Sequence, residues 1–154
     1  IEHHAGTLVL GENKRWKQDC DMGSQNNQNF VSMPTGLLKQ MIIYKASDAG
    51  IKTIMQEESY TSQADITAMD YIPVYGVDAE NAVFSGRRIS RSLYRCFNGM
   101  IINADCNGAA NIMRKAITDA WNSITDFSFL ASPEVLGFHE LNPLSISVKG
   151  IAAA

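Results

Sequence analysis

The sequence predicts an α/β fold in which helices cover a layered sheet. Two short segments, residues 7–10 and 51–57, have the length and apolar content of strands. Between them, residues 34–49 have the apolar spacing of an amphipathic helix. A strand, a helix and a second strand in this order are typical of layered α/β sheets. The 154 residues, 45% apolar and 19% charged, suit one globular domain.

The first strand and the first helix both have recognisable ends. The apolar run at residues 7–10 stops at Gly11, and residues 12–29 are polar and are expected to form an exposed loop. Pro34 suits the first turn of the helix, and Gly50 lies where a C-terminal glycine belongs. One side of this helix is expected to pack inward through Leu37, Leu38, Met41, Ile42 and Ala49. In the following strand, Ile51, Thr53 and Met55 alternate against Lys52, Ile54 and Gln56.

The second half of the chain is expected to contain an irregular segment, a hairpin and another helix. Residues 62–82 have no strong periodicity. Residues 82–102 resemble a hairpin, with Val83-Phe84 and Leu93-Tyr94 beside a basic stretch and a turn at Asn98-Gly99. An apolar stripe runs through residues 107–121 and predicts a helix that packs closely on a sheet. Residues 145–148 are a candidate edge strand.

The net charge of −3 argues against a nucleic-acid-binding surface that covers the whole chain, but local basic patches remain. Arginine suits phosphate through its bidentate fork, and tryptophan can stack on a base. The alternatives are a solvated hairpin for the first cluster and a tryptophan that anchors a loop for the second. The two candidate nucleic-acid-binding clusters are Arg87, Arg88, Arg91 and Arg95, and Lys14, Arg15, Trp16 and Lys17.

The cysteines and the hydropathy of the sequence limit the cellular compartments in which we expect this protein. Cys20, Cys96 and Cys106 form no CxxC pair, which excludes a standard zinc ribbon and favours a reducing cytoplasm over a disulfide scaffold. No apolar run approaches the roughly 20 residues that span a bilayer, and Ile1 begins no signal-peptide pattern. We therefore expect a cytoplasmic, nucleoid-associated protein without a membrane partner. The chain has no initiator methionine, so we expect a fragment or processed piece of a longer protein.

Three ordered segments carry a resemblance to a known family. Residues 9–18 read VLGENKRWKQ and are similar to a VIGxNKxWKQ segment, residues 57–62 are similar to EEsYTS, and residues 102–112 are similar to a DxNxAxNI close. Residues 85–95 fit the same pattern between them. In this order and spacing, over roughly residues 5–117, the chain resembles one branch of the OrfB/TnpB insertion-sequence proteins, the group ancestral to type V CRISPR effectors.

The resemblance implies the C-terminal part of an RNase H-like (RuvC-type) nuclease domain, a mixed sheet with flanking helices that lacks its N-terminal strands here. Residues 1–122 would form this part, with residues 62–102 as a degenerate zinc-ribbon or hairpin insertion and residues 123–154 as a tail. DNA, a guide RNA and the upstream part of the same protein are the implied partners. No structural zinc is expected, because the stretch after residue 61 lacks the cysteines of the family's ribbon.

The implied nuclease core holds Mg²⁺ or Mn²⁺ between carboxylates from separate elements. Asp105 matches the last acid of the family core, and its alternative role is that of a helix N-cap. The middle acid usually ends the strand where Gly11 stands, and this branch is thought to use a relocated glutamate, here Glu58. Glu57, Glu12 or no catalytic glutamate are the alternatives. The first acid lies upstream in the family, so we expect this piece to be inactive alone.

The resulting hypothesis is a segment of a transposon-encoded, RNA-guided DNA endonuclease that hydrolyses phosphodiesters with a metal ion. Retention of Asp105 favours this reading. The glycine at position 11 favours a nuclease-dead relative that binds nucleic acid without cutting it, unless Glu58 substitutes. A decayed transposase remnant is the third reading, since the residues after Asn122 have no clear signal.

Overall fold

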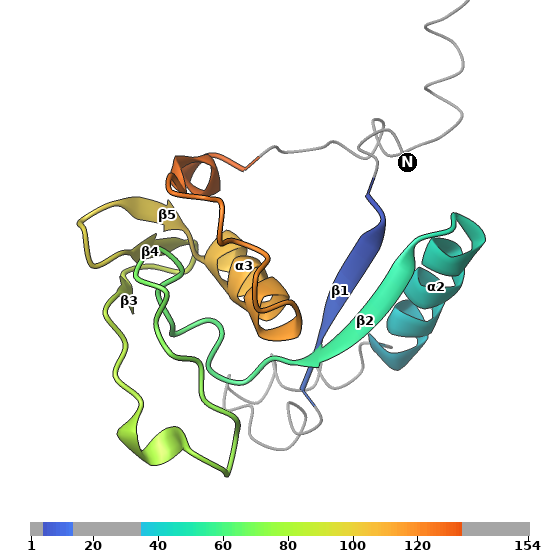
Figure 1. The fold of residues 1–154 in the computed structure, drawn as a ribbon, viewed down its shortest axis with the longest axis horizontal. Helices are drawn as coiled ribbons and strands as arrows, with labels where there is room; N and C mark the ends of the chain where they lie inside the picture. Colours follow the sequence, from blue (N-terminus) through green and yellow to red (C-terminus); the bar gives the residue numbers. More distant parts are fainter. Residues whose placement is uncertain (1–4, 14–34, 134–154) are drawn as a thin grey trace, which may run out of the picture.

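A computed structural model describes residues 5–13 and 35–133, which form a mixed α/β fold (Figure 1). Strands β1 (Thr7–Glu12) and β2 (Lys52–Glu57) pair in parallel, in register from Thr7↔Lys52 to Glu12↔Glu57. Helix α2 (Thr35–Asp48) lies between them in the chain and packs against β2. The predicted strand–helix–strand unit is therefore confirmed.

A second sheet is antiparallel and contains three short strands, β3 (Arg87–Arg88), β4 (Leu93–Arg95) and β5 (Ile101–Asn103). The predicted turn between the last two is confirmed, with the Cys96 N–H donating to the Met100 carbonyl at 2.8 Å. The expectation that Val83-Phe84 forms the first strand is wrong. Phe84 instead stacks on the ring of Tyr60 at 6.3 Å between centroids, which takes it away from the sheet.

Helix α3 (Ala104–Ala116) lies between the two sheets and contacts both (Figure 1). The Asn103 side chain is its N-cap and accepts from the N–H groups of Asp105 at 2.9 Å and Cys106 at 3.0 Å. The N-cap alternative for Asp105 is therefore wrong, because this residue lies inside the first turn. The predicted helix at residues 107–121 also ends too late. Trp121 folds back and donates its indole N–H to the Ala110 carbonyl at 3.0 Å.

The hydrophobic core lies between α3, the antiparallel sheet and the segment that follows α3. Its fully or largely buried members are Ile66, Tyr94, Cys96, Ile102, Ala104, Ala110, Phe127 and Leu130. Cys96 is thus a packed free thiol, and burial raises its pKa to about 11. Cys106 is free and partly buried against the same core.

The layer formed by α2 and β2 departs from the prediction. Gly50 ends the helix with a φ of +72°, as expected for a C-terminal glycine, and the Ile51 N–H donates to the Ala46 carbonyl at 2.8 Å. Ala46 is the buried residue of α2, however, and Leu37, Leu38 and Met41 are each more than half exposed. Met55 of β2 is also exposed, whereas Ile54 is half-buried. The side of α2 that packs is therefore the one with Ala46, and the predicted inward side is wrong for Leu37, Leu38 and Met41, which no described residue covers.

Two buried asparagines fasten α3 to the loop that follows β2. The Asn107 amide donates to the Ala64 carbonyl at 2.8 Å, and its oxygen accepts from the Ile66 N–H at 3.2 Å. The Asn111 amide donates to the carbonyls of Thr61 at 3.0 Å and Ala64 at 2.7 Å. Residues four apart on a helix share one face, so both amides reach the same loop. They satisfy backbone groups that no strand pairs with.

Two aspartates organise the segment at residues 62–82, which is irregular, as predicted, apart from turns and the short 3-10 helix η1 (Ala79–Asn81). Asp65 is fully buried and accepts from the N–H groups of Thr67 at 2.8 Å and Phe97 at 2.6 Å. Asp70 accepts from the N–H groups of Asp65 at 2.9 Å and Ser85 at 2.8 Å. These carboxylates tie the segment to itself and to the antiparallel sheet.

Several expectations lie outside the described residues: most of the loop at residues 12–29, the edge strand at residues 145–148, Cys20, and the cluster of Lys14, Arg15, Trp16 and Lys17. Among the described helices, none has the length and apolar character required to cross a membrane.

The asparagine contacts predict a specific loss of stability. Replacing Asn107 by alanine removes the buried acceptor of the Ile66 N–H, whereas the Ala64 carbonyl keeps its hydrogen bond from Asn111. We expect the Asn107→Ala variant to lower the free energy of unfolding by about 1–3 kcal/mol in urea denaturation. Asn122→Ala, at an exposed position, is the matched control and should change it by less than about 0.5 kcal/mol. Equal effects of the two substitutions would contradict the role given to Asn107.

Candidate active site

A cavity of about 410 Å³ lies where the N-terminal turns of α3 meet the corner that follows β2. Glu58 and Asp105 both line it, so the structure brings together the two acids that the sequence singles out. Arg88 of β3 lines it as well. The remaining lining residues come from the corner, from α3 and from the end of β1: Asn13, Ser59, Tyr60, Thr61, Ser62, Ala104, Gly108, Ala109 and Ile112.

Glu58 is held at a tight corner directly after β2. Its N–H donates to the Glu12 carbonyl at 3.3 Å, and its carbonyl accepts from the Thr61 N–H at 3.2 Å and the Thr61 hydroxyl at 2.7 Å. Tyr60 has a φ of +63°, in the left-handed region that side chains other than glycine rarely adopt. The corner thus has a strained residue next to its acid, and surrounding contacts must hold it.

Gly11 provides the space for the Glu58 carboxylate. A Cβ atom built at Gly11 would overlap that carboxylate and would lie 3.0 Å from the Ile112 Cδ1 atom. The Lys39 ammonium donates to the Gly11 carbonyl at 2.8 Å and helps to fix this end of β1. The carboxylate of Glu58 therefore lies where a residue at position 11 would begin its own side chain, and only glycine permits that approach.

Asp105 is displayed on the first turn of α3. Its side chain is 85% exposed and lies 3.6 Å from Arg88, measured from the Arg88 Nη2 atom to the Asp105 Oδ1 atom. Arg88 also donates to the carbonyls of Ser90, at 3.2 Å, and Arg91. An exposed ion pair of this length contributes little to stability. The carboxylate of Asp105 is accordingly open to a further ligand.

Glu57 points away from the cavity and is engaged elsewhere. Its carboxylate accepts from the Lys115 ammonium at 2.5 Å and from the Ser59 N–H at 2.6 Å. Partial burial opposes ionisation of Glu57, but the hydrogen bonds from Lys115 and Ser59 outweigh it, so its pKa lies below the usual value. The two adjacent glutamates thus differ: Glu58 lines the cavity with Asp105, whereas Glu57 forms a structural ion pair. Glu12, which pairs with Glu57 across β1 and β2, does not line the cavity either.

The donor set of this cavity suits a hard cation. Two carboxylates supply oxygen ligands, which Mg²⁺ prefers, and Mg²⁺ commonly uses one or two protein carboxylates together with water. Within residues 5–13 and 35–133, no three side chains of His, Cys, Asp or Glu lie close enough together to hold a metal. Glu58 and Asp105 therefore fit part of the coordination of a divalent ion.

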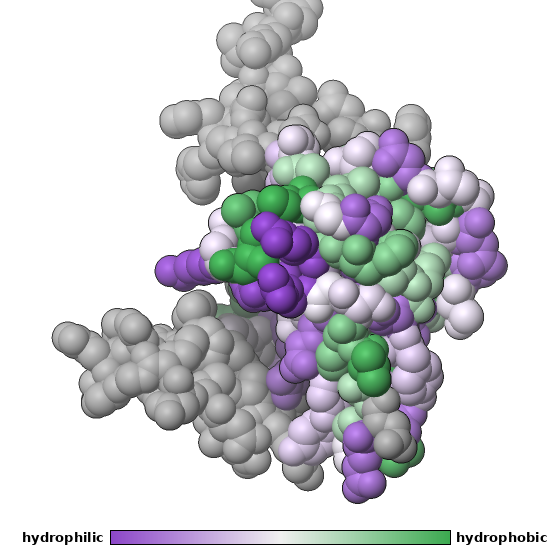
Figure 2. Space-filling model, turned by 90° about the vertical axis from the view of Figure 1, so that its left-hand side faces the viewer, coloured by the Kyte–Doolittle hydropathy of each residue, from purple (hydrophilic) through white to green (hydrophobic). Residues whose placement is uncertain are grey.

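The outer face of the antiparallel sheet carries Arg87 and Arg95 of the arginine cluster, whereas Arg88 lines the cavity. Arg87 and Arg95 lie directly opposite each other, and both are exposed. In the described part of the chain, the side chains of Arg87, Arg91 and Arg95 form no hydrogen bond or ion pair. Seen from the side of this sheet, strongly hydrophilic and apolar surfaces lie next to each other (Figure 2). The exposed apolar residues of this region are Ile89, Leu93, Phe97 and Ile101.

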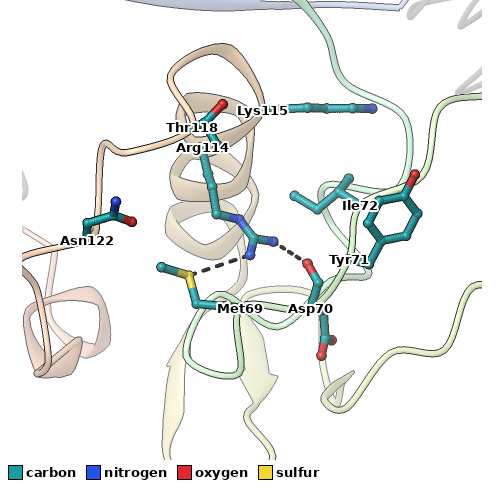
Figure 3. Close-up of a pocket in the computed structure, with 8 residues that line it drawn as sticks. All are labelled: Met69, Asp70, Tyr71, Ile72, Arg114, Lys115, Thr118 and Asn122. Carbon is teal, nitrogen blue, oxygen red and sulfur yellow. Dashed lines mark hydrogen bonds between the residues drawn. The ribbon is translucent and has the colours of Figure 1, made fainter.

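A second cavity, of about 520 Å³, lies toward the other end of α3 (Figure 3). Arg114 reaches into the loop there and donates to the Asp70 carbonyl at 2.6 Å and the Asn111 oxygen at 3.1 Å. No residue predicted as functional lines it. Sequence reasoning also missed the roles of Asn107, Asn111 and Lys115, although their spacing of four residues places all three on one face of α3.

Comparison with known proteins shows to which family the chain belongs. Residues 36–112, half of its length, match the family described as Cas12f1-like, TNB domain. The chain belongs to this family. The matched range contains Glu58, Asp105 and the arginine cluster, and it confirms the predicted relationship to the TnpB and Cas12 proteins.

A curated relative supports the same family. The chain is 37% identical over 93 residues to the CRISPR-associated endodeoxyribonuclease Cas12f1 of Sulfoacidibacillus thermotolerans. The aligned part covers 60% of this chain but 18% of that relative, so this Cas12f1-like chain spans less than a fifth of the relative's length.

The contact between position 11 and Glu58 predicts an energetic coupling. We expect Gly11→Ala to lower the free energy of unfolding by about 1–3 kcal/mol, because the new methyl group overlaps the carboxylate and crowds Ile112. In a Glu58→Ala background the same change should cost less, and a double-mutant cycle in urea measures the difference. Gly6→Ala is the control, since its Cβ would meet no atom within 4 Å. Equal costs in the two backgrounds would exclude the contact.

Proposed function

We propose that this chain supplies two metal-binding carboxylates and part of the nucleic-acid surface of an RNA-guided, metal-dependent DNA endonuclease. The observation that carries the proposal is the cavity shared by Glu58 and Asp105. A corner after β2 and the first turn of α3 are separate in sequence, yet they bring one carboxylate each to the same cavity. Such convergence from rigid elements is what a metal-dependent site requires.

We propose an RNase H-like arrangement in which the rest of a longer protein completes the domain. Sheets in proteins usually have about four to six strands, yet the parallel sheet has two among the described residues. The exposed apolar residues of α2, such as Leu38 and Met41, fit a surface that further elements cover. The third carboxylate of the site would come from those elements.

Glu58, Asp105 and Arg88 each have a defined task in this proposal. Mg²⁺ or Mn²⁺, when bound, supplies the positive charge that phosphodiester hydrolysis needs at its transition state. Glu58, seated against Gly11, and Asp105, on the first turn of α3, hold that ion. Arg88 is close enough to Asp105 to contact a phosphate oxygen of DNA next to it. No structural zinc is needed, because the carboxylates of Asp65 and Asp70 fasten the segment where the family's ribbon has cysteines.

The outer face of the antiparallel sheet fits single-stranded nucleic acid, either target DNA or guide RNA. Like charges directly opposite on a ladder destabilise it, and the Arg87–Arg95 pair lacks a protein anion among the described residues. A phosphate backbone supplies the missing negative charge. Exposed Phe97 beside the arginines offers a ring on which a base can stack.

Removal of either carboxylate tests the catalytic proposal. In the full-length protein that carries this segment, loaded with its guide RNA, we expect Glu58→Gln and Asp105→Asn to reduce DNA cleavage by at least a hundredfold while DNA binding is retained. The reason is that an amide carries no negative charge for a divalent ion. Glu80→Gln and Asp119→Asn, at exposed positions outside the cavity, are the matched controls.

The outcome of that experiment also decides the second candidate function. Gly11 stands where many relatives of the resembled family have an acid, which favours a nuclease-dead nucleic-acid-binding protein. If the unaltered protein binds guided DNA but does not cut it with Mg²⁺ or Mn²⁺, that candidate replaces the nuclease. If it cuts and Glu58→Gln cuts equally well, Glu58 is not the relocated acid.

Salt dependence tests the arginine surface separately. We expect Arg87→Ala and Arg95→Ala each to weaken binding of a fluorescent single-stranded oligonucleotide. Each should also reduce the magnitude of the negative slope of the log association constant against log salt concentration by about 1. Fluorescence anisotropy at several salt concentrations measures both quantities. Lys52→Ala, an exposed cation on β2, is the control and should leave the slope unchanged. An unchanged slope in both arginine variants would remove this face from the nucleic-acid interface.

A further inference from the structure

Lys115 lies on the same face of α3 as Asn107 and Asn111, one turn further along. Its side chain is only 10% exposed. The ammonium contacts three acceptors: the Glu57 carboxylate at 2.5 Å, the Ser59 carbonyl at 3.2 Å and the Pro73 carbonyl at 3.0 Å. Figure 3 shows that Lys115 leaves the helix in a different direction from Arg114. Lys115 therefore reaches the corner after β2, whereas Arg114 reaches the loop at Asp70.

The three contacts use the full donor capacity of a lysine, which has three N–H groups and no acceptor. Two of them fall on the residues immediately before and after Glu58. Burial of an ammonium is costly unless it is paired and hydrogen-bonded, and Lys115 meets both conditions at this corner. The helix that displays Asp105 thus contacts both neighbours of the other acid, through the side chain of Glu57 and the backbone of Ser59.

The corner is strained and is held at two points. Tyr60 has a φ of +63°, and such a conformation persists only where neighbouring contacts enforce it. Lys115 holds the residues before Tyr60, through Glu57 and Ser59, and Asn111 holds Thr61 after it. Without the lysine, the segment would keep the bond from the Glu58 N–H to the Glu12 carbonyl and the contact from Asn111 to Thr61, but it would lose the contacts of Lys115 with Glu57 and Ser59.

We infer that Lys115 is a positioning residue that keeps the Glu58 carboxylate against Gly11, where it shares a cavity with Asp105. The inference rests on the proposed metal-binding function of these two acids. Residues that orient a metal ligand without touching the metal commonly change metal affinity by about 10- to 100-fold when they are removed. A purely structural lysine would instead change stability and leave the metal affinity of the folded protein unaltered.

The experiment measures Mn²⁺ binding by electron paramagnetic resonance to the full-length protein that carries this segment, in which the proposed third carboxylate is present. Lys115→Met keeps the apolar stem and removes the ammonium, and we expect it to weaken Mn²⁺ binding at least tenfold. Lys45→Met removes an exposed lysine of α2 and should bind Mn²⁺ as the unaltered chain does. Circular dichroism of each variant gives the folded fraction, to which the affinities are normalised.

A second pair of variants keeps the test decisive if Lys115→Met does not fold. Glu57→Gln retains an oxygen that can accept from Lys115, whereas Glu57→Leu does not. We expect Mn²⁺ affinity to be largely preserved in the first and weakened at least tenfold in the second. Equal affinities in this pair would overturn the inference.

The remaining outcomes separate the inference from the proposed function. If Glu58→Gln and Asp105→Asn abolish Mn²⁺ binding while Lys115→Met binds as tightly as the unaltered chain, Lys115 does not position Glu58 and the metal site stands. If the unaltered chain does not bind Mn²⁺, or if the Glu58 and Asp105 variants bind it equally well, the metal site fails and the positioning role fails with it.

Discussion

The buried hydrogen bonds from Asn107 and Asn111 to the loop after β2 are the contacts on which the arrangement of this protein depends. The parallel pair and the antiparallel sheet share no ladder within the described residues, so they are connected through α3 and through the loop after β2, which α3 holds in place. The apolar side of α3 can slide or rotate against a sheet at modest cost, because hydrophobic contact is not directional. Amide-to-backbone hydrogen bonds are directional and allow one register. They fix the relative position of the corner with Glu58 and the turn with Asp105.

The sequence predicted the elements whose signals are local. Strand length, the strand–helix–strand order, the Asn98-Gly99 turn and the glycine after α2 all arise from properties of a few neighbouring residues. Burial depends on what lies opposite, and this explains the error for α2: periodicity identifies the residues that share a face, but not the surface that covers them. The helix start was misplaced because Asn103, rather than Asp105, satisfies the first free N–H groups. Val83 and Phe84 have strand-like side chains, yet ring stacking on Tyr60 outweighed that preference.

The acids of the candidate site could be singled out from the sequence, but the residues that position them could not. A family resemblance singled out Glu58 and Asp105, and the alternation of a strand separates Glu57 from Glu58, which matches their different surroundings. Nothing in a linear sequence indicates that a lysine at position 115 will meet a carboxylate at position 57. The direction in which Arg88 faces was also not predicted from the sequence. It was grouped with Arg87 as part of one basic surface, but adjacent residues on a strand face opposite ways, and Arg88 lines the acid cavity while Arg87 lies on the outer face.

The close approach of the Glu58 carboxylate to Gly11 has an evolutionary consequence. A side chain at position 11 would occupy the volume that the Glu58 carboxylate fills here, so presenting a carboxylate from the end of β1 requires the Glu58 side chain to move. A lineage that moves its acid from one to the other must pass through a step that either crowds two side chains or has none. A series of single substitutions therefore passes through a disfavoured intermediate, and paired substitutions are the direct route between the two positions of the acid.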